Sequence, residues 1–343
     1  MTKEQRINFF LESMVEVRKR RGWLLTGNNI YSPLVRFDVK ESDMDLDFFN
    51  NHVFEEWENY FEHHENISVF TGINRYFCKF ENRRNDVLNE NDQIKVYVPL
   101  DGEHLREGVK KIFDFLEVNN IPHISKVAKR IRFDDIVIRL SDEDDAEKLF
   151  QFLRENKYIQ EGLIEPNPFA VEREGINFAA DKDISYNMTV SNLIAVYIND
   201  VTDKNEKPSM EGFRRFIYNY YCEIDSKNDV KKLVTLGMSS DDYSNVLLYN
   251  YMRVIELIYQ SMDTRFKYSN YLEYYNENNT NYYRAFDLEA QPNDNSLDFG
   301  EKAQPNDNSL DFEEEDKFVE EMLKNILIKF GSKKLPDGER EYS

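Results

Sequence analysis

The chain has 343 residues, 41% of them hydrophobic and including 25 Phe and 21 Tyr, and this supply of apolar side chains excludes a wholly disordered protein. Asp and Glu number 65 against 44 Lys and Arg, so the formal net charge is −21. Such a surface repels nucleic acid and anionic membranes, and we expect neither as a partner of the whole chain.

The cysteine and hydropathy patterns indicate a cytoplasmic protein. Cys78 and Cys222 lie far apart and outside any C-x-x-C pair, which excludes a zinc site built on thiolates and favours two reduced thiols. No run of 18 apolar residues is present, so no membrane span is expected, and residues 1–23 lack the apolar region of a Sec signal. Delivery by a specialised secretion system stays open, because it needs no such signal.

The N-terminal residues 1–93 are predicted to form a mostly helical region. Apolar residues recur with a period near 3.6 over 4–20 and again over 44–64, which is typical of amphipathic helices. Residues 27–29 are expected to form a turn, and alternating apolar residues over 65–90 favour short strands.

Residues 94–200 are predicted to form one α+β unit, because strand and helix patterns follow one another in the order β-α-β-β-α. The expected strands are 94–100, 121–128 and 132–140, with a short closing strand near 160–164, and the expected helices are 102–118 and 142–156. Asp101 is expected to cap the first helix. The order favours both helices on one face of the sheet. The predicted fold class is therefore α+β, with a small mixed sheet, helices on one face, and helical N- and C-terminal regions flanking it.

The C-terminal part is again mostly helical by its pattern. A loop is expected over 165–183, followed by helices near 186–199, 208–224 and 240–262. The sequence AQPNDNSLDF occurs twice and is poor in apolar residues, which is typical of a disordered acidic linker. An amphipathic helix and tail follow, and this acidic tail is a candidate surface for a protein partner. The predicted divisions are 1–93, 94–200, 201–286 (helical), 287–313 (linker) and 314–343 (helix and tail).

A basic cluster stands out in this acidic chain. It consists of Lys126, Lys129, Arg130, Arg132 and Arg139. On an unbroken strand Arg130 and Arg132 share one face and Arg139 lies on the other. Arginine forks and a lysine that loses its proton when desolvated suit a phosphate or carboxylate ligand. The alternative interpretation is a solvated strand edge whose charges are balanced by nearby acids.

Two histidines flank the cluster, and neither has the spacing of a metal ligand. His104 and His123 are candidate proton donors, His123 the more so for its closeness to Lys126, although a structural histidine satisfied by its neighbours is the more ordinary interpretation. Without an H-E-x-x-H or H-x-x-x-H pattern we expect no metal. No glycine-rich phosphate loop or G-x-S-x-G is present, and no cofactor is expected.

The ordered features of residues 96–200 resemble the HopA-type family of bacterial effector proteins. The matching positions are Pro99, Lys126, Val127, 132–135, Pro168, Phe169, Gly175, Ile176, Ala179, Asp181 and Ser185. One position departs from the pattern within the second strand, where His123 replaces a phenylalanine. The resemblance covers about a third of the chain.

The resemblance implies a phospho-Ser/Thr lyase, which removes phosphate from a phosphorylated peptide or protein by β-elimination. Lys126 would be the base that removes the Cα proton and Arg132 would hold the phosphate, with Arg130 and Arg139 in support. The family's histidine acid on the first strand is absent, and His104, His123 or Tyr97 is left to replace it. Whether the chain is an enzyme therefore stays open. The alternative is an effector or interaction protein that uses the same fold only as a binding surface.

Overall fold

The structure is a computed structural model, and it describes residues 1–36, 51–74, 77–82, 93–128, 132–181, 185–227 and 245–272. The predicted α+β class is confirmed. The helices are α1 (Lys3–Arg21), α2 (Gly27–Val35), α4 (Asn51–Phe61), α5 (Gly102–Val118), α6 (Glu143–Glu155), α7 (Lys157–Gly162), α8 (Tyr186–Asp203), α9 (Met210–Lys227) and α11 (Asn245–Ser261). The strands are β1 (Ile67–Asn74), β2 (Phe77–Asn82), β3 (Gln93–Val98), β4 (Ile124–Ala128), β5 (Ile136–Leu140), β6 (Val171–Arg173) and β7 (Ile176–Asp181).

The strands form one sheet in the order β1-β2-β4-β5-β3-β7-β6. Each described pairing is antiparallel, so the mixed sheet expected from the sequence is corrected to an antiparallel one. The sheet also reaches beyond the predicted unit 94–200, because β1 and β2 join it beside β4. The division of the chain into domains stays a prediction.

The sheet is completed by a hairpin in a segment that was expected to be a loop. Residues 165–183 contain β6 and β7, which pair antiparallel across a two-residue turn. Glu174 and Gly175 occupy that turn with φ of 49° and 83°. Positive φ at both positions matches the right-handed twist of a short hairpin. The loop prediction was wrong because it gave more weight to Pro166 and Pro168, which precede β6, than to the alternating residues that follow them.

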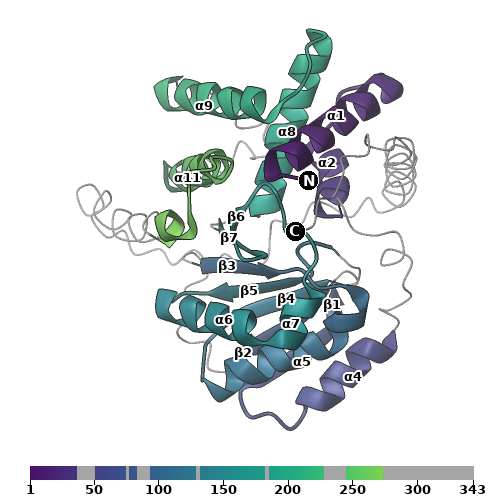
Figure 1. Cartoon of the computed structure of the whole chain (residues 1–343), viewed down its shortest axis with the longest axis vertical. Helices are drawn as coiled ribbons and strands as arrows, with labels where there is room; N and C mark the ends of the chain where they lie inside the picture. The colour runs from purple at the N-terminus through teal and green to yellow at the C-terminus, as the bar shows by residue number, and fades with distance from the viewer. Residues whose placement is uncertain are drawn as a thin grey trace, which may run out of the picture.

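One face of the sheet is apolar and is covered by α4, α5, α6 and α7, which lie in the lower half of Figure 1. Phe80 on β2 and Phe178 on β7 belong to the same cross-strand row on this face. Phe113 of α5 stacks on Phe80 at 4.2 Å between ring centroids, and Phe150 of α6 lies 6.2 Å from Phe178. The expectation that 102–118 and 142–156 pack on the same face is confirmed. Helix α7 replaces the strand expected near 160–164, where only a single bridge forms.

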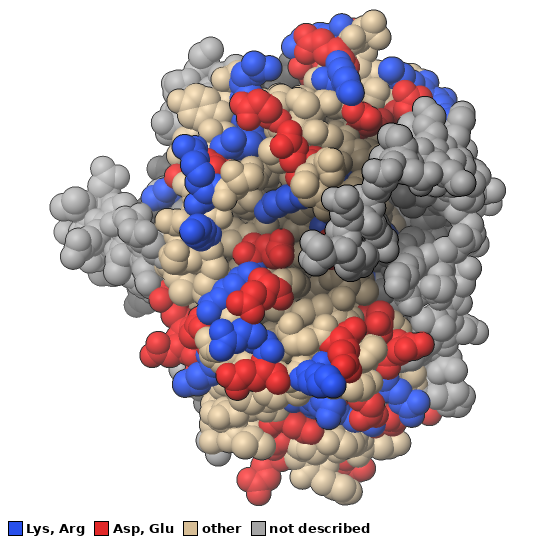
Figure 2. Space-filling model, in the orientation of Figure 1, with Lys and Arg blue, Asp and Glu red and all other residues tan. Residues whose placement is uncertain are grey.

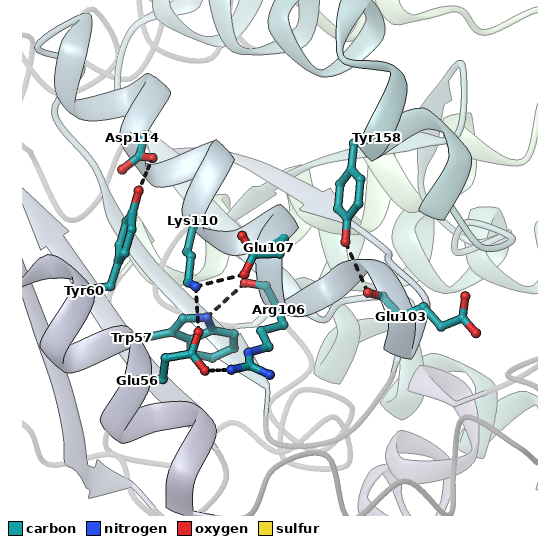
Figure 3. A network of polar contacts seen from close by, with 9 residues as sticks. All are labelled: Glu56, Trp57, Tyr60, Glu103, Arg106, Glu107, Lys110, Asp114 and Tyr158. Atoms are coloured by element: carbon teal, nitrogen blue, oxygen red, sulfur yellow. Dashed lines mark hydrogen bonds and ion pairs between the residues drawn. The ribbon is translucent and has the colours of Figure 1, made fainter.

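Helix α4 is fixed to α5 by polar contacts at their crossing. Trp57 is fully buried, and its indole nitrogen donates to the carbonyl of Arg106 at 3.1 Å. Glu56 accepts from Lys110 at 2.6 Å and also from the Arg106 guanidinium (Figure 3). The described helix begins at Asn51, and residues 44–50 of the expected helix lie outside the described part.

The remaining helices pack around α8, in the upper half of Figure 1. The turn expected at 27–29 is instead the start of α2, and the prediction was wrong because Thr26 and Asn29 form a capping box. Gly27 lies so close to Asn192 of α8 that a side chain there would collide with it. Helices α1, α8, α9 and α11 confirm the helices expected near 4–20, 186–199, 208–224 and 240–262. Residues 287–313 and 314–343 lie outside the described part.

Among the described helices, none is both long and apolar enough to cross a membrane.

Candidate functional site

Basic side chains gather on the sheet face opposite α4–α7. Cross-strand partners in neighbouring strands point to the same face, so the register defines rows of side chains. The first row runs from Lys79 on β2 through Lys126 and Val137 to Tyr97 on β3. The second row, one step along the strands, runs from Ile124 on β4 through Arg139 to Lys95 on β3. We call Lys126, Arg139, Lys95 and Tyr97 the cationic face.

Lys126 is half-buried on this face and has an unusual environment for a lysine. Its Nζ lies 4.2 Å from the ring centre of Phe77. Within the described part of the chain, it forms no hydrogen bond or ion pair. Burial, together with the charges of Arg139, Lys95 and Arg132, lowers the pKa of Lys126 to about 7, while Asp134 opposes them. Near neutral pH a large share of Lys126 is therefore an uncharged amine, which is able to accept a proton.

Arg139 lies diagonally next to Lys126, and Lys95 lies directly opposite Arg139. Arg139 was expected to face away from Arg132 on a continuous strand, but β5 begins only at Ile136, after a turn, so that alternation does not reach Arg132. Lys95 is 2% exposed and was missed in the sequence. A lysine inside the otherwise apolar run Ile94 to Val98 was the signal for it, because lysine is almost never fully buried without a role or a partner.

Arg132 contributes to the site only indirectly, because its guanidinium is bound to Asp134 and Tyr31. It donates to both carboxylate oxygens of Asp134 at 2.6 and 3.0 Å, and to the Tyr31 hydroxyl of α2 at 3.0 Å. Burial opposes the charge, but Asp134 and Tyr31 outweigh burial and raise the pKa of Arg132. Asp134 also accepts from Asn187 of α8 at 2.8 Å. This group fastens the turn before β5 to α2 and α8. Arg130, the other predicted phosphate ligand, lies outside the described residues.

The structure brings neither candidate histidine to Lys126. His123 shares the parity of Ser125 and so points to the apolar face, where its ring lies 5.3 Å from that of Phe113. Its Nδ1 lies 2.9 Å from Ser125 Oγ, and burial lowers the pKa of His123 to about 3, so the ring is neutral. His104 lies in the first turn of α5, on that same side, with Nδ1 2.7 Å from Asp101.

Two further polar side chains, those of Tyr97 and Asp135, point to the same face as Lys126. Tyr97 is fully buried, and the Lys95 ammonium lies 5.5 Å from its ring centre. Asp135 continues the ladder of β5, since its carbonyl accepts from the Ala128 amide at 2.7 Å. Burial raises the pKa of Asp135 well above its ordinary range, while a hydrogen bond from the Arg132 backbone amide opposes this. Along the strands, Asp135 lies one step to one side of Lys126, and Arg139 and Lys95 lie one step to the other side. Tyr97 lies in the same row as Lys126 and next to Lys95.

The described residues contain no group of three His, Cys, Asp or Glu side chains suited to a metal ion. The cationic face combines side chains of different chemistry. The face provides a neutral amine, cations that suit a phosphate dianion, and a phenol.

No protein-family model matches the chain, and no curated protein matches it. Among solved structures it is similar to the effector protein from Pseudomonas syringae pv. syringae strain 61, with 12% identity, a TM-score of 0.44, and coverage of 63% of this chain and 94% of that one. It is also similar to the effector protein from Pseudomonas syringae pv. tomato strain DC3000, with 13% identity, a TM-score of 0.43 and the same coverage.

Proposed function

We propose that this protein is a phospho-Ser/Thr lyase of the HopA type, which eliminates phosphate from a phosphorylated peptide or protein. One observation carries the proposal. The amine of Lys126, with a pKa of about 7 and no ion pair within the described residues, shares a sheet face with the cations Arg139 and Lys95. A base beside a phosphate-binding pair is the combination that β-elimination needs.

The reaction divides among these side chains as follows. Arg139 and Lys95 hold the phosphate oxygens, and the fork of Arg139 suits bidentate binding. Lys126 removes the proton from Cα, the electron pair forms the Cα–Cβ double bond, and the Cβ–O bond to phosphate breaks. Tyr97 donates a proton to the departing phosphate. Arg132, which the resemblance made the phosphate ligand, instead positions the turn before β5 through its pair with Asp134.

The resemblance over residues 96–200 supports the assignment of Lys126 as the base. The location of the protein, in the cytoplasm or delivered by a specialised secretion system, and the binding of a partner by the acidic tail stay predictions.

The test is phosphate release from a phosphothreonine peptide, with the dehydrated product detected by mass spectrometry. Lys126→Ala and Arg139→Ala are each expected to lower kcat/KM by at least 100-fold, within the range for loss of a general base or an oxyanion donor. Lys148→Ala, at an exposed lysine of α6 on the other side of the sheet, is the matched control and is expected to keep full activity. Wild-type protein that releases no phosphate would contradict the proposal.

A second candidate is a phosphopeptide-binding protein without catalysis. The observation that favours it is that both histidines lie away from Lys126, which leaves the fully buried Tyr97 as donor. Fluorescence anisotropy separates the two candidates. Tight binding of the labelled phosphopeptide that depends on Arg139, without release of phosphate, would favour binding alone.

A further inference from the structure

We infer that the β1–β2 end of the cationic face binds the polypeptide beside the phosphorylated residue, with Phe70 contacting an apolar side chain of the substrate. This inference rests on the proposed function and names the class of substrate: an extended phosphopeptide with an apolar residue at a fixed distance from the phosphate. A free phosphoamino acid lacks this contact.

The row that contains Lys126 runs from solvent into the interior of the protein. Phe70 on β1 pairs with Lys79, and Lys79 pairs with Lys126. Phe70 is 37% exposed and the Lys79 side chain 42% exposed, Lys126 is half-buried, and Tyr97 at the far end is 0% exposed. A substrate that reaches Lys126 along the row therefore arrives over β1 and β2.

Two aromatic side chains point to the solvent-open end of this face. On β1 the inward positions are Ile67 and Val69, and Phe70 takes an outward position where an edge strand usually carries a polar residue. Phe77 on β2 also points outward, and its ring touches both Lys126 and the guanidinium of Arg132, 5.3 Å away. A single exposed aromatic needs no explanation, but Phe70 points to the same sheet face as Phe77, whose ring lies against the reactive amine.

The charges between Phe70 and Lys126 suit a neutral stretch of peptide. Lys79 forms an ion pair with Glu81, which points to the same face, so its charge is balanced. The next cations on this face are Lys126 and, one step along the strands, Arg139 and Lys95. The phosphate is therefore drawn past Lys79 to Lys126 and Arg139, while the apolar residue stays over Phe70.

The strand spacing fixes where the apolar residue falls in the substrate. Phe70 and Lys126 are two strands apart, roughly 10 Å, because neighbouring strands lie about 4.8 Å apart. A peptide in the polyproline II conformation advances about 3.1 Å per residue and returns to the same side every three residues, so the apolar side chain is about three residues from the phosphothreonine. It lies on one side of the phosphothreonine only, since the sheet continues into buried structure on the other.

The experiment compares two substrates in wild-type protein and in Phe70→Ser. The first is a peptide with leucine three residues from phosphothreonine, tested with the leucine on either side, and the second is N-acetyl-phosphothreonine methylamide. Phe70→Ser is expected to raise KM for one of the two peptides roughly tenfold without changing kcat, and to leave the minimal substrate unchanged. Tyr218→Ser, at an exposed tyrosine of α9, is the matched control and is expected to behave as wild type.

Each outcome decides one question. Equal KM values for wild type and Phe70→Ser with both peptides overturn the binding surface and leave the lyase proposal intact. Equal losses on peptide and minimal substrate also overturn it, because they show an effect through the fold. Wild-type protein inert on every substrate removes the lyase proposal, and anisotropy with the labelled peptides then tests the surface alone, where Phe70→Ser must weaken binding for the inference to stand.

Discussion

Lys126 carries the chemistry of the cationic face because it is surrounded by like charges and is only partly solvated. Both effects favour the neutral amine, and together they bring its pKa from 10.5 to about 7. An ordinary surface lysine would be a poor base at neutral pH because it is almost entirely protonated. The charge of Asp134, which raises the pKa of Lys126, is largely neutralised by Arg132, which donates to both carboxylate oxygens of Asp134.

The pH dependence of the reaction follows from this pKa. Below about pH 7 the active, neutral fraction of Lys126 falls tenfold per unit, so kcat/KM is expected to rise with pH and to level off above about 7 to 8. Initial rates of phosphate release between pH 5.5 and 9 measure the profile. An activity that falls as pH rises through 7 would show that the protonated lysine is the active form, as expected for a phosphate ligand and not for a base.

The role of Tyr97 as proton donor is testable through the leaving group. Tyr97→Phe is expected to lower elimination from a phosphothreonine peptide by a factor of about 100 or more. Elimination from the matching O-sulfothreonine peptide should change little, since sulfate is a weak base and leaves without a proton. Lys126→Ala is expected to impair both reactions. Equal losses on the two peptides in Tyr97→Phe would assign Tyr97 a packing role, and the melting temperature of the variant checks its fold.

The helices were largely predictable because their signals are local. The apolar stripe of α5 and its cap follow from residues within one turn of each other, and Asp101 accepts from the amides of Glu103 and His104 at 3.0 and 2.9 Å as the cap prediction requires. The bounds of the strands were harder to predict. The segment containing β5 was expected to begin at Arg132, but Asp134 and Asp135 take their partners from a turn, and this displaced Arg132 from the face assigned to it.

The cap of α5 gives a prediction for stability. Asp101→Ala removes the acceptor for two backbone amides and the contact with His104 Nδ1, and is expected to cost about 1 kcal/mol of unfolding free energy. Asp142→Ala, at the cap of α6, removes an acceptor for one amide and is the comparison. Urea unfolding measures both. A smaller loss for Asp101→Ala than for Asp142→Ala would contradict this account of the α5 cap.

At the scale of the whole molecule, the sequence could not show which strands become neighbours. β3 precedes β4 in the chain, yet β5 lies between them in the sheet, and that order places Lys95 beside Arg139. The basic cluster was visible as a run around Lys126, but Lys95, a buried cation of the cationic face, comes from a strand about thirty residues earlier. Local patterns predict elements, whereas the site is made by pairings between distant segments. His123, three residues before Lys126, lies on the other side of the sheet because side chains alternate along the chain, and His104 lies on that side in α5.

The overall charge also sets which phosphopeptides are captured. The net charge is −21, and on the side shown in Figure 2 acidic and basic side chains are interspersed. Long-range attraction therefore favours a substrate with basic residues outside the contact with Phe70 and Lys126, while the phosphate is bound only at short range by Arg139 and Lys95.

A peptide with distal lysines is expected to have a kcat/KM several-fold higher than one with distal glutamates at low salt. The difference should shrink at 0.5 M NaCl, where the screening length falls to about 4 Å. Rates measured for the two peptides across a salt series check this, and a preference that does not change with salt would place the lysines in direct contact with the protein.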